Sequence, residues 1–583
     1  MTPAHQPPKP WRILALLCIP VFIGSVDLTI VSAILPEVLV TLGLPTDTRL
    51  DDAFWMVSGY LLAYTISMVF VGRLSDLVGR RQVYIGTLVL FMFGSYFVAV
   101  AHTWPADLYL RVFRELNPDA RPPAEELRIL HMIILGRVIQ ALGAGSMAPV
   151  TMAMVADLFP RGKRARPIGL VGAVDTTGWM LGHLYGGIMV NFFGQNTDAI
   201  LDILASLGLS SLGAPDWRTL FWFNLVTGGF TLIAVIITLR HVPQQRLRER
   251  FDFLGTGLII VALVGLNLGL GSTNPQAPEN VAAFQTASET GSNLAAPLLI
   301  MGGIAFLLFI LVETRLKHPL VNVKLFLQRN VATAGFVNVA VGFCLALGLV
   351  VLPILVNLRE GEASAESIQE AALVVGLLLS GLTVPMALAA LPGAWMSDQY
   401  GYRNTTTLGM LFAWAGFGLA GVTWQPDTPY GLMAAQMVLI GIGLGLTISP
   451  VAAAVINAAK DSERGSASAM VLALRLLGMT VALTALTDFA INRVNRLVQE
   501  RSAGLTDMTS LYVDTAFEVG REIMLLGAFV AFITVLVAWN MRGGQSSDAG
   551  SAILATPTRT ERRRTPDITE REGRAEGTRV VPS

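Results

Sequence analysis

The carboxylate of Asp27 occupies a position where a charged group costs free energy. Asp27 lies in the apolar stretch from Trp11 to Leu42, and no other charged residue occurs between Ile13 and Pro36. This stretch is long enough to cross a bilayer as a helix, and an intramembrane charge is expensive unless something compensates it. Asp27 is therefore the first candidate for a working residue, and the chemistry open to it is to bind and release a proton.

Arg137 is a second charge inside an apolar stretch, residues 130–156. Arginine keeps its charge even when it is buried, so Arg137 needs a carboxylate or several carbonyl groups nearby, and Asp27 is a suitable partner. Two interpretations are open. The pair is purely structural, or Asp27 exchanges Arg137 for a proton as a cavity opens, which would couple proton flow to a conformational cycle.

Asp175 and His183 add two titratable groups to the apolar stretch 167–193. Their spacing places them about 80° apart around a helix and about 12 Å apart along it, so both can line one cavity. His183 either donates to a backbone carbonyl or handles a proton. Arg475 lies in the later apolar stretch 467–491, 300 residues after Asp175 and at the equivalent position. A contact between Asp175 and Arg475 across the cavity is a further hypothesis.

The composition is that of a helical membrane protein. Of 583 residues, 53% are hydrophobic and 14% are charged, whereas soluble domains average about 25% charged residues. The net charge is zero and gives no argument for a nucleic-acid partner. Cys18 and Cys344 fall in apolar stretches, so we expect no disulfide, redox site, metal site or cofactor. We find no Gly-rich ATP-binding loop with a lysine and no catalytic triad, so an enzyme is not expected.

The elements that position these residues are apolar runs long enough to cross a bilayer, and the chain holds 14 of them. An even number places both termini on one side. The short segments on that side are richer in arginine and lysine, which favours cytoplasmic termini. We therefore predict a multi-pass protein of a bacterial plasma (inner) membrane. Its first span is expected to stay in the mature protein and not to be cleaved as a signal peptide. The spans are 12–40, 54–73, 82–101, 130–156, 167–193, 219–240, 253–271, 295–314, 332–357, 371–394, 404–424, 430–457, 467–491 and 522–541.

A short motif occurs twice in the chain. Ser-Asp-x-x-Gly-x-Arg follows the second span at 75–81 and the tenth span at 397–403. Glycines of spans 4 and 5 recur 300 residues later in spans 12 and 13. Spans 1–6 and 9–14 are therefore predicted to be two copies of one six-helix unit, an organisation typical of transporters that bind substrate at mid-membrane. The recurring glycines are Gly143 and Gly443, Gly145 and Gly445, and Gly178 and Gly478.

This repeat divides the chain into four parts. We predict a first six-helix bundle at 1–241, a two-helix insert with its linkers at 242–331, and a second six-helix bundle at 332–541. The remainder, 542–583, is rich in Arg, Thr, Ser and Glu and cannot bury a core, so we predict a disordered cytoplasmic tail. The fold class is an all-α polytopic membrane protein.

The repeated motif has the properties of a latch between two domain arrangements. Gly72 permits close approach of two helices, and Gly79 permits a tight turn. Asp76 can face the partly positive N-terminus of another helix, while Arg80 and Arg81 are held at the membrane surface. The corresponding latch candidates of the second copy are Asp398 and Arg403.

Four segments together resemble the major facilitator superfamily, specifically its 14-span drug:proton antiporter type, over residues 11–541. Segment 27–36, with its Asp, its Thr and its closing Leu-Pro, is similar to the first-span motif of that family, and 72–81 is similar to the loop signature. Segment 136–145 resembles the span 4 motif, whose Arg is associated with proton transfer, and 217–224 resembles the start of span 6. His183 stands where the family's span 5 motif carries a proline.

The resemblance implies a major facilitator fold of two six-helix bundles plus a two-helix insert. It also implies a proton-coupled secondary exporter of hydrophobic or amphipathic small molecules, as in multidrug efflux, that works by alternating access. The partners would be that substrate, protons, the lipid bilayer and, in a Gram-negative cell, a periplasmic adaptor. The candidate residues of the substrate cavity are Thr29, Gln140, Trp179 and Arg475.

Two alternatives to drug efflux are open. One keeps the fold but makes the cargo a lipid or lipid-like metabolite that is exported or flipped. The other is a sensor or scaffold without net transport, which the sequence disfavours because a scaffold has no need of buried charge.

Overall fold

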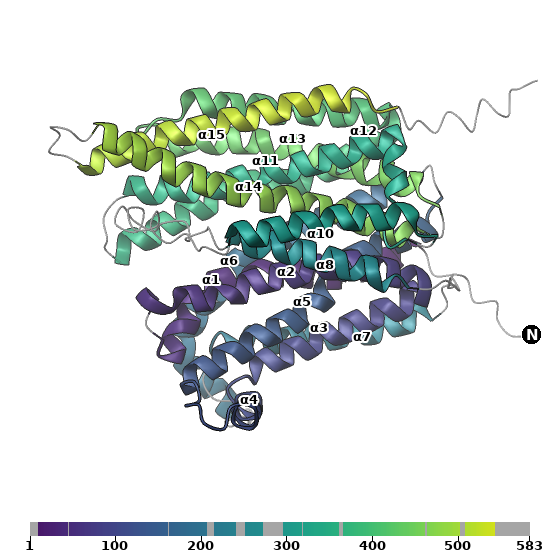
Figure 1. Cartoon of the computed structure of the whole chain (residues 1–583). Coiled ribbons are helices and arrows are strands. Elements are labelled where there is room, and N and C mark those ends of the chain that lie inside the picture. Colours follow the sequence, from purple (N-terminus) through teal and green to yellow (C-terminus); the bar gives the residue numbers. More distant parts are fainter. Residues whose placement is uncertain are drawn as a thin grey trace, which may run out of the picture. The chain divides into compact units, whose positions relative to one another are not determined.

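The computed structural model describes residues 10–44, 46–160, 163–206, 215–240, 251–271, 295–317, 319–360, 365–460, 463–501 and 508–542. Within these ranges the regular structure consists of helices (Figure 1). Helices are expected here because a backbone in hydrocarbon must satisfy its own hydrogen bonds. The all-α fold class is confirmed. The predicted tail, apart from Arg542, lies outside the described residues.

Each of the six predicted spans of the first half corresponds to one helix, although the third and the sixth run one or two residues past its end. The first three are α1 (Pro10–Leu42), α2 (Thr46–Val78) and α3 (Arg80–Ala99). Gly79 alone separates α2 from α3, with a φ of 111°, as the predicted tight turn requires. A short helix, α4 (Trp104–Leu116), lies in the long connection to span 4. The remaining helices are α5 (Glu125–Leu158), α6 (Ala165–Ser206) and α7 (Arg218–Leu239).

The two helices of the predicted insert, α8 (Phe253–Gly271) and α10 (Ala295–Arg315), pack against each other (Figure 1). A short 3-10 helix, η4 (Val323–Leu327), then leads into α11 (Arg329–Glu360). Spans 10 and 11 form one long element, α12 (Ala365–Thr423), which Gly401 interrupts with a φ of 81°. The chain continues through α13 (Tyr430–Ala458), α14 (Arg464–Arg501) and α15 (Met508–Ala538). The bounds given to the two bundles and the insert stay predictions.

The number of spans follows from these helices. Among the described residues, 11 helices are long and apolar enough to cross a membrane. One of them is α12, which holds two predicted spans, and the described part of α8 is a shorter apolar helix, Phe253–Leu266. Together with α6, these helices cover the 14 predicted spans.

The repeated glycines make equivalent contacts in the two halves. In the first half, span 4 lies so close to spans 2 and 3 that an added side-chain carbon would clash with their backbones, and span 5 approaches span 1 in the same way. In the second half, span 12 makes the equivalent contacts with spans 10 and 11, and span 13 with span 9. Such small-residue contacts are typical of membrane helix packing. The packing around these glycines therefore repeats in the two halves. The contacts are Gly143–Phe91 and Gly443–Ala413, Gly145–Tyr64 and Gly445–Met386, and Gly178–Ser25 and Gly478–Val339.

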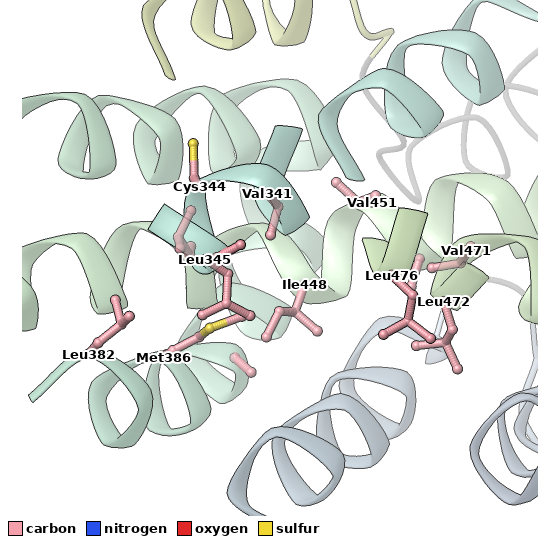
Figure 2. Close-up of a cluster of buried hydrophobic side chains, with 14 of the residues drawn as sticks. Val341, Cys344, Leu345, Leu382, Met386, Ile448, Val451, Val471, Leu472 and Leu476 are labelled. Carbon is pink, nitrogen blue, oxygen red and sulfur yellow. The ribbon is translucent and has the colours of Figure 1, made fainter. Parts of the chain in front are cut away.

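Buried aliphatic side chains hold the helices of the second half together. Figure 2 shows Leu345 of α11, Met386 of α12, Ile448 of α13 and Leu476 of α14 within one cluster. Because lipid tails are as apolar as leucine, close van der Waals packing rather than escape from water stabilises such a cluster in a membrane. Because this cluster is apolar, the groups able to do chemistry are the polar side chains of neighbouring helices.

Candidate functional site

Asp27 and Arg137 form a buried ion pair between α1 and α5. Arg137 Nη1 contacts Asp27 Oδ2, and Arg137 Nη2 donates to the backbone carbonyl of Asp27 at 3.0 Å. The two residues are 1% and 0% exposed, so the carboxylate points into the helix bundle and not into surrounding hydrocarbon. The partner that the sequence suggested for Arg137 is therefore the one that it contacts.

Asn224 on α7 completes the surroundings of the carboxylate. Its Nδ2 donates to Asp27 Oδ1 at 2.7 Å, so each carboxylate oxygen has its own donor. The sequence placed Asn224 in a motif of span 6 without giving it a role. An asparagine in an apolar run was the available signal, because a buried amide must find a partner.

Gln140 and Tyr60 hold the guanidinium from the other side. Arg137 Nη1 donates to Gln140 Oε1 at 2.6 Å, and Gln140 Nε2 donates to Ser95 Oγ at 2.7 Å. The guanidinium carbon lies 3.9 Å from the centre of the Tyr60 ring, close enough for a cation–π interaction. Arg137 thus has hydrogen-bonding and aromatic partners besides the carboxylate.

Asp175 and Arg475 form a second pair of buried charges, between α6 and α14. They are 2% and 4% exposed. Ser25 Oγ on α1 donates to Asp175 Oδ1 at 2.6 Å. The charges of Asp175 and Arg475 attract each other, but no ion pair joins these two described residues, and Arg475 Nε is buried without a hydrogen-bond partner. In this arrangement the predicted contact is therefore an approach of the two charged side chains without an ion pair between them.

Thr29 and Trp179 lie where α1 meets α6. Thr29 Oγ1 donates to the backbone carbonyl of Trp179 at 2.8 Å. An added side-chain carbon on Gly178 or Gly182 would clash with α1, so these glycines permit the approach. The Trp179 indole N–H is buried without a hydrogen-bond partner. The side chain of His183, further along α6, lies outside the described residues.

The first copy of the loop motif contacts the opposite half of the chain. Asp76 accepts hydrogen bonds from the backbone N–H groups of Gly465 at 3.0 Å and Ser466 at 3.2 Å, at the start of α14. Arg80 Nη2 donates to Asp76 at 3.0 Å. A carboxylate at a helix N-terminus is stabilised by the unsatisfied N–H groups and the helix dipole. Asp76 therefore has the partner type that the sequence predicted.

Asp157, at the end of α5, joins the same contact. It pairs with Arg80 of α3 and, at 3.0 Å, with Arg464 of α14. A single carboxylate therefore bridges arginines from both halves. No role was predicted for Asp157, since an Asp at the end of a span ordinarily faces water.

The second copy of the motif is held more loosely. Asp398 lies 3.4 Å from Arg166 Nε at the start of α6, but Arg166 is 53% exposed, and exposed ion pairs contribute little. Arg403 lies 3.8 Å over the Trp539 ring, and Arg81 donates to the backbone carbonyl of Arg240 at 3.3 Å. Arg81 and Arg403 thus contact their own half, and the stronger contact between halves belongs to the first copy.

Comparison with known proteins identifies the family. The family model described as Major Facilitator Superfamily matches residues 17–361 and 340–495. This chain belongs to the Major Facilitator Superfamily. Members of this superfamily are membrane transporters, and membership indicates that this chain is one as well. In the described part of the chain, no group of three or more His, Cys, Asp or Glu is placed to hold a metal ion.

Similar superfamily members carry transporter names. A triacylglyceride transporter of Mycobacteroides abscessus is 29% identical over 486 residues, which cover 81% of each chain. A triacylglyceride transporter of Mycobacterium tuberculosis is 26% identical over 522 residues, which cover 86% of each chain.

Solved superfamily structures share the fold. A double-tryptophan mutant of the E. coli xylose transporter XylE has a TM-score of 0.55 at 15% identity and covers 93% of this chain and 98% of its own. The human organic anion transporter MFSD10 has a TM-score of 0.53 at 14% identity and covers 90% of this chain and 100% of its own. At these identities the likeness concerns the fold alone.

Proposed function

We propose that this superfamily transporter exports a hydrophobic, lipid-like molecule in exchange for protons by alternating access. The observation that carries the proposal is the fully buried Asp27–Arg137 pair, with Asn224 on the free side of the carboxylate. A buried ion pair is weak support for stability. An intramembrane carboxylate that has a cationic partner is, by contrast, suited to proton exchange.

The exchange requires Asp27 and Arg137 to separate in one conformation. When the two are in contact, the carboxylate is stabilised in its charged form by Arg137 and Asn224. When the helices move apart, Asp27 takes up a proton, and the guanidinium keeps Gln140 and the Tyr60 ring as partners. When they meet again, Arg137 displaces the proton to the other side of the membrane. Asp175, Arg475 and His183 are proposed as further groups of this pathway.

The latch sets which side of the membrane has access. We call the helix ends that carry residues 72–81 and 394–403 the loop-motif end. There, Asp76 and Asp157 hold the start of α14 against the first half, which supports a conformation closed at that end. Opening requires these charged hydrogen bonds to break, each worth about 1.5–3 kcal/mol. Positive residues at this end favour a cytoplasmic position for it and for both termini.

The names of the relatives support a lipid-like cargo. The relatives of M. abscessus and M. tuberculosis are named triacylglyceride transporters, and each is matched over more than four-fifths of its length. This favours the lipid alternative over the drug-like cargo that the first-span motif implied. Export of amphipathic drugs is the second candidate, and the observation that favours it is the similarity of residues 27–36 to the drug:proton antiporter motif.

The proposal is tested by transport in proteoliposomes under an imposed pH gradient. A fluorescent triacylglyceride, a cationic dye and a fluorescent phospholipid serve as parallel cargoes. We expect gradient-dependent movement of the triacylglyceride. Movement of the dye alone would favour the second candidate, and movement of either cargo at the same rate without a gradient would contradict proton coupling.

A further inference from the structure

The short helix α4 lies just beyond the end of a membrane-spanning helix. Only residues 100–103 separate it from α3. The Trp104 ring packs edge-on against Phe97 of α3, with ring centres 5.5 Å apart. Further along, the Tyr109 ring lies 5.7 Å from the ring of His131 on α5. The flank of α4 that carries Tyr109 is therefore turned toward the protein, while Trp104 fixes the start of α4 to the end of α3.

A second flank of α4 is apolar and uncovered. Trp104, Leu108, Val112 and Leu116 recur at every fourth position and are 43%, 49%, 45% and 74% exposed. Side chains four residues apart are offset by about 40° around a helix, so these four form one stripe about 120° wide. In a soluble protein a stripe of this kind would be packed against a core.

The third flank carries charge. Asp107, Arg111 and Arg114 lie on the side of the helix away from Tyr109, and all three are exposed. Glu115, also exposed, lies beside the stripe near the end of α4. Going around α4, the flanks are thus protein, then the apolar stripe, then charge. This order is typical of a helix that lies in a membrane interface, with its apolar side toward the acyl chains and its charged side toward water.

The stripe is continuous with the surface that the spanning helices expose to lipid. Phe93 and Phe97 on α3 contact each other, and Phe97 contacts Trp104, so a row of aromatic rings runs from α3 into α4. Phe93 is 48% exposed on α3, and Trp222 is 45% exposed on the neighbouring α7. In a membrane protein such exposed aromatic groups near helix ends lie at the level of the headgroups.

We propose that α4 is an interfacial helix that binds the bilayer surface beside the α3–α5 connection. Leu108, Val112 and Leu116 lie in the outer part of the acyl region. Arg111 and Arg114 extend their apolar stems along that surface and hold their guanidinium groups among lipid phosphates. The occupant of the stripe is thus lipid, and neither a protein partner nor a second copy of the chain.

The experiment places one nitroxide spin label at a time on α4 of the full chain in phosphatidylethanolamine–phosphatidylglycerol vesicles. The native Cys18 and Cys344 are buried, so labels attach to the introduced cysteines. Leu108→Cys and Val112→Cys report on the stripe. Arg111→Cys and Arg114→Cys are matched controls on the charged flank of the same helix. Collisions with oxygen, which concentrates in the acyl region, are compared with collisions with a water-soluble nickel complex.

We expect the oxygen-to-nickel ratio to be higher at 108 and 112 than at 111 and 114. Equal, nickel-dominated ratios at all four positions would mean that water covers the stripe, and would overturn the proposal. Exclusion of both reagents from 108 and 112 would mean that protein covers it, and would overturn the proposal as well. The readout does not depend on the cargo or on proton coupling, so it stands or falls separately from the proposed function.

Discussion

Asn224 donates a 2.7 Å hydrogen bond to Asp27 Oδ1, while Arg137 pairs with the other oxygen of the same carboxylate. Three helices, α1, α5 and α7, therefore meet at one carboxylate. Movement of α7 relative to α1 would remove one donor from the carboxylate even where the contact with Arg137 persists. In the proposed mechanism, Asn224 thus links a shift of α7 to proton binding at Asp27.

Replacement of Asn224 should slow gradient-driven transport. Asn224→Leu keeps the approximate volume but removes a hydrogen bond to a charged group, worth about 1.5–3 kcal/mol. Because one oxygen of the Asp27 carboxylate then lacks its donor, we expect slower transport in proteoliposomes under an imposed pH gradient. Thr227→Ala, one turn further along α7 and exposed, is the control and should leave the rate unchanged.

The sequence predicts the central pair but not its surroundings. Asp27 and Arg137 are charges in apolar runs, so their cost identifies them and makes each a suitable partner for the other. Asn224, Tyr60 and Ser95 are uncharged, and such residues occur in many spans. Their role depends on how α7, α2 and α3 are rotated relative to α1 and α5. For helices surrounded by lipid and protein, the pattern of apolar residues does not predict this rotation.

The close approach of Gly72 to α14 should be essential for fast turnover. A side-chain carbon on Gly72 would lie 2.5 Å from Ala469 Cβ and 2.7 Å from the Gly465 carbonyl. Gly72→Ala should therefore separate α2 from α14 at an overpacking cost of about 1–3 kcal/mol. We expect slower transport with little change in substrate affinity.

The matched control for Gly72 is Gly86→Ala on α3. An added carbon on Gly86 meets no atom within 4 Å, so transport should be unaffected. Equal turnover in the two variants and the wild type would show that the approach at Gly72 is no latch.

Asp157 should stabilise closure of the loop-motif end. It is the carboxylate that Arg80 and Arg464 share, so Asp157→Asn weakens the contact from both halves at once. Because its side chain is 28% exposed, we expect a shift in the conformational equilibrium of about 1 kcal/mol rather than loss of the fold. The measure is the labelling rate of cysteines placed near Gly465, which should rise. An unchanged rate would contradict the role.

Asp175 and Arg475 should be energetically coupled although they are not bonded here. Asp175→Asn leaves a buried guanidinium with less compensation, and Arg475→Gln leaves a buried carboxylate, so each single variant should slow transport. The double variant should be less impaired than the sum of the two, with a coupling energy of about 0.5–3 kcal/mol. Strict additivity in this double-mutant cycle would mean that the two charges act independently. Ser25→Ala, which removes only the hydroxyl donor to Asp175, separates the hydrogen bond from the charge.

The internal repeat shows which helix contacts of the fold can be predicted from the sequence. The glycines at an offset of 300 residues predicted equivalent packing because a glycine in an apolar run permits a close helix contact, and Gly178 and Gly478 do contact span 1 and its equivalent. Asp157 was not predicted, because its partners Arg80 and Arg464 come from different halves and nothing local to Asp157 indicates them. Contacts within one repeat follow from the pattern, whereas contacts between halves depend on how the halves dock.

The central claim, that Asp27 binds the transported proton, is tested most directly by substrate-driven proton movement in proteoliposomes that contain a lumenal pH indicator. The wild type should move protons when substrate is added. Asp27→Asn keeps the shape of the side chain but cannot cycle a proton, and it leaves Arg137 uncompensated at a cost of about 3–5 kcal/mol. We expect this variant to insert, bind substrate and move no protons. Substrate-driven proton movement at the wild-type rate in Asp27→Asn would contradict a role of Asp27 in proton binding.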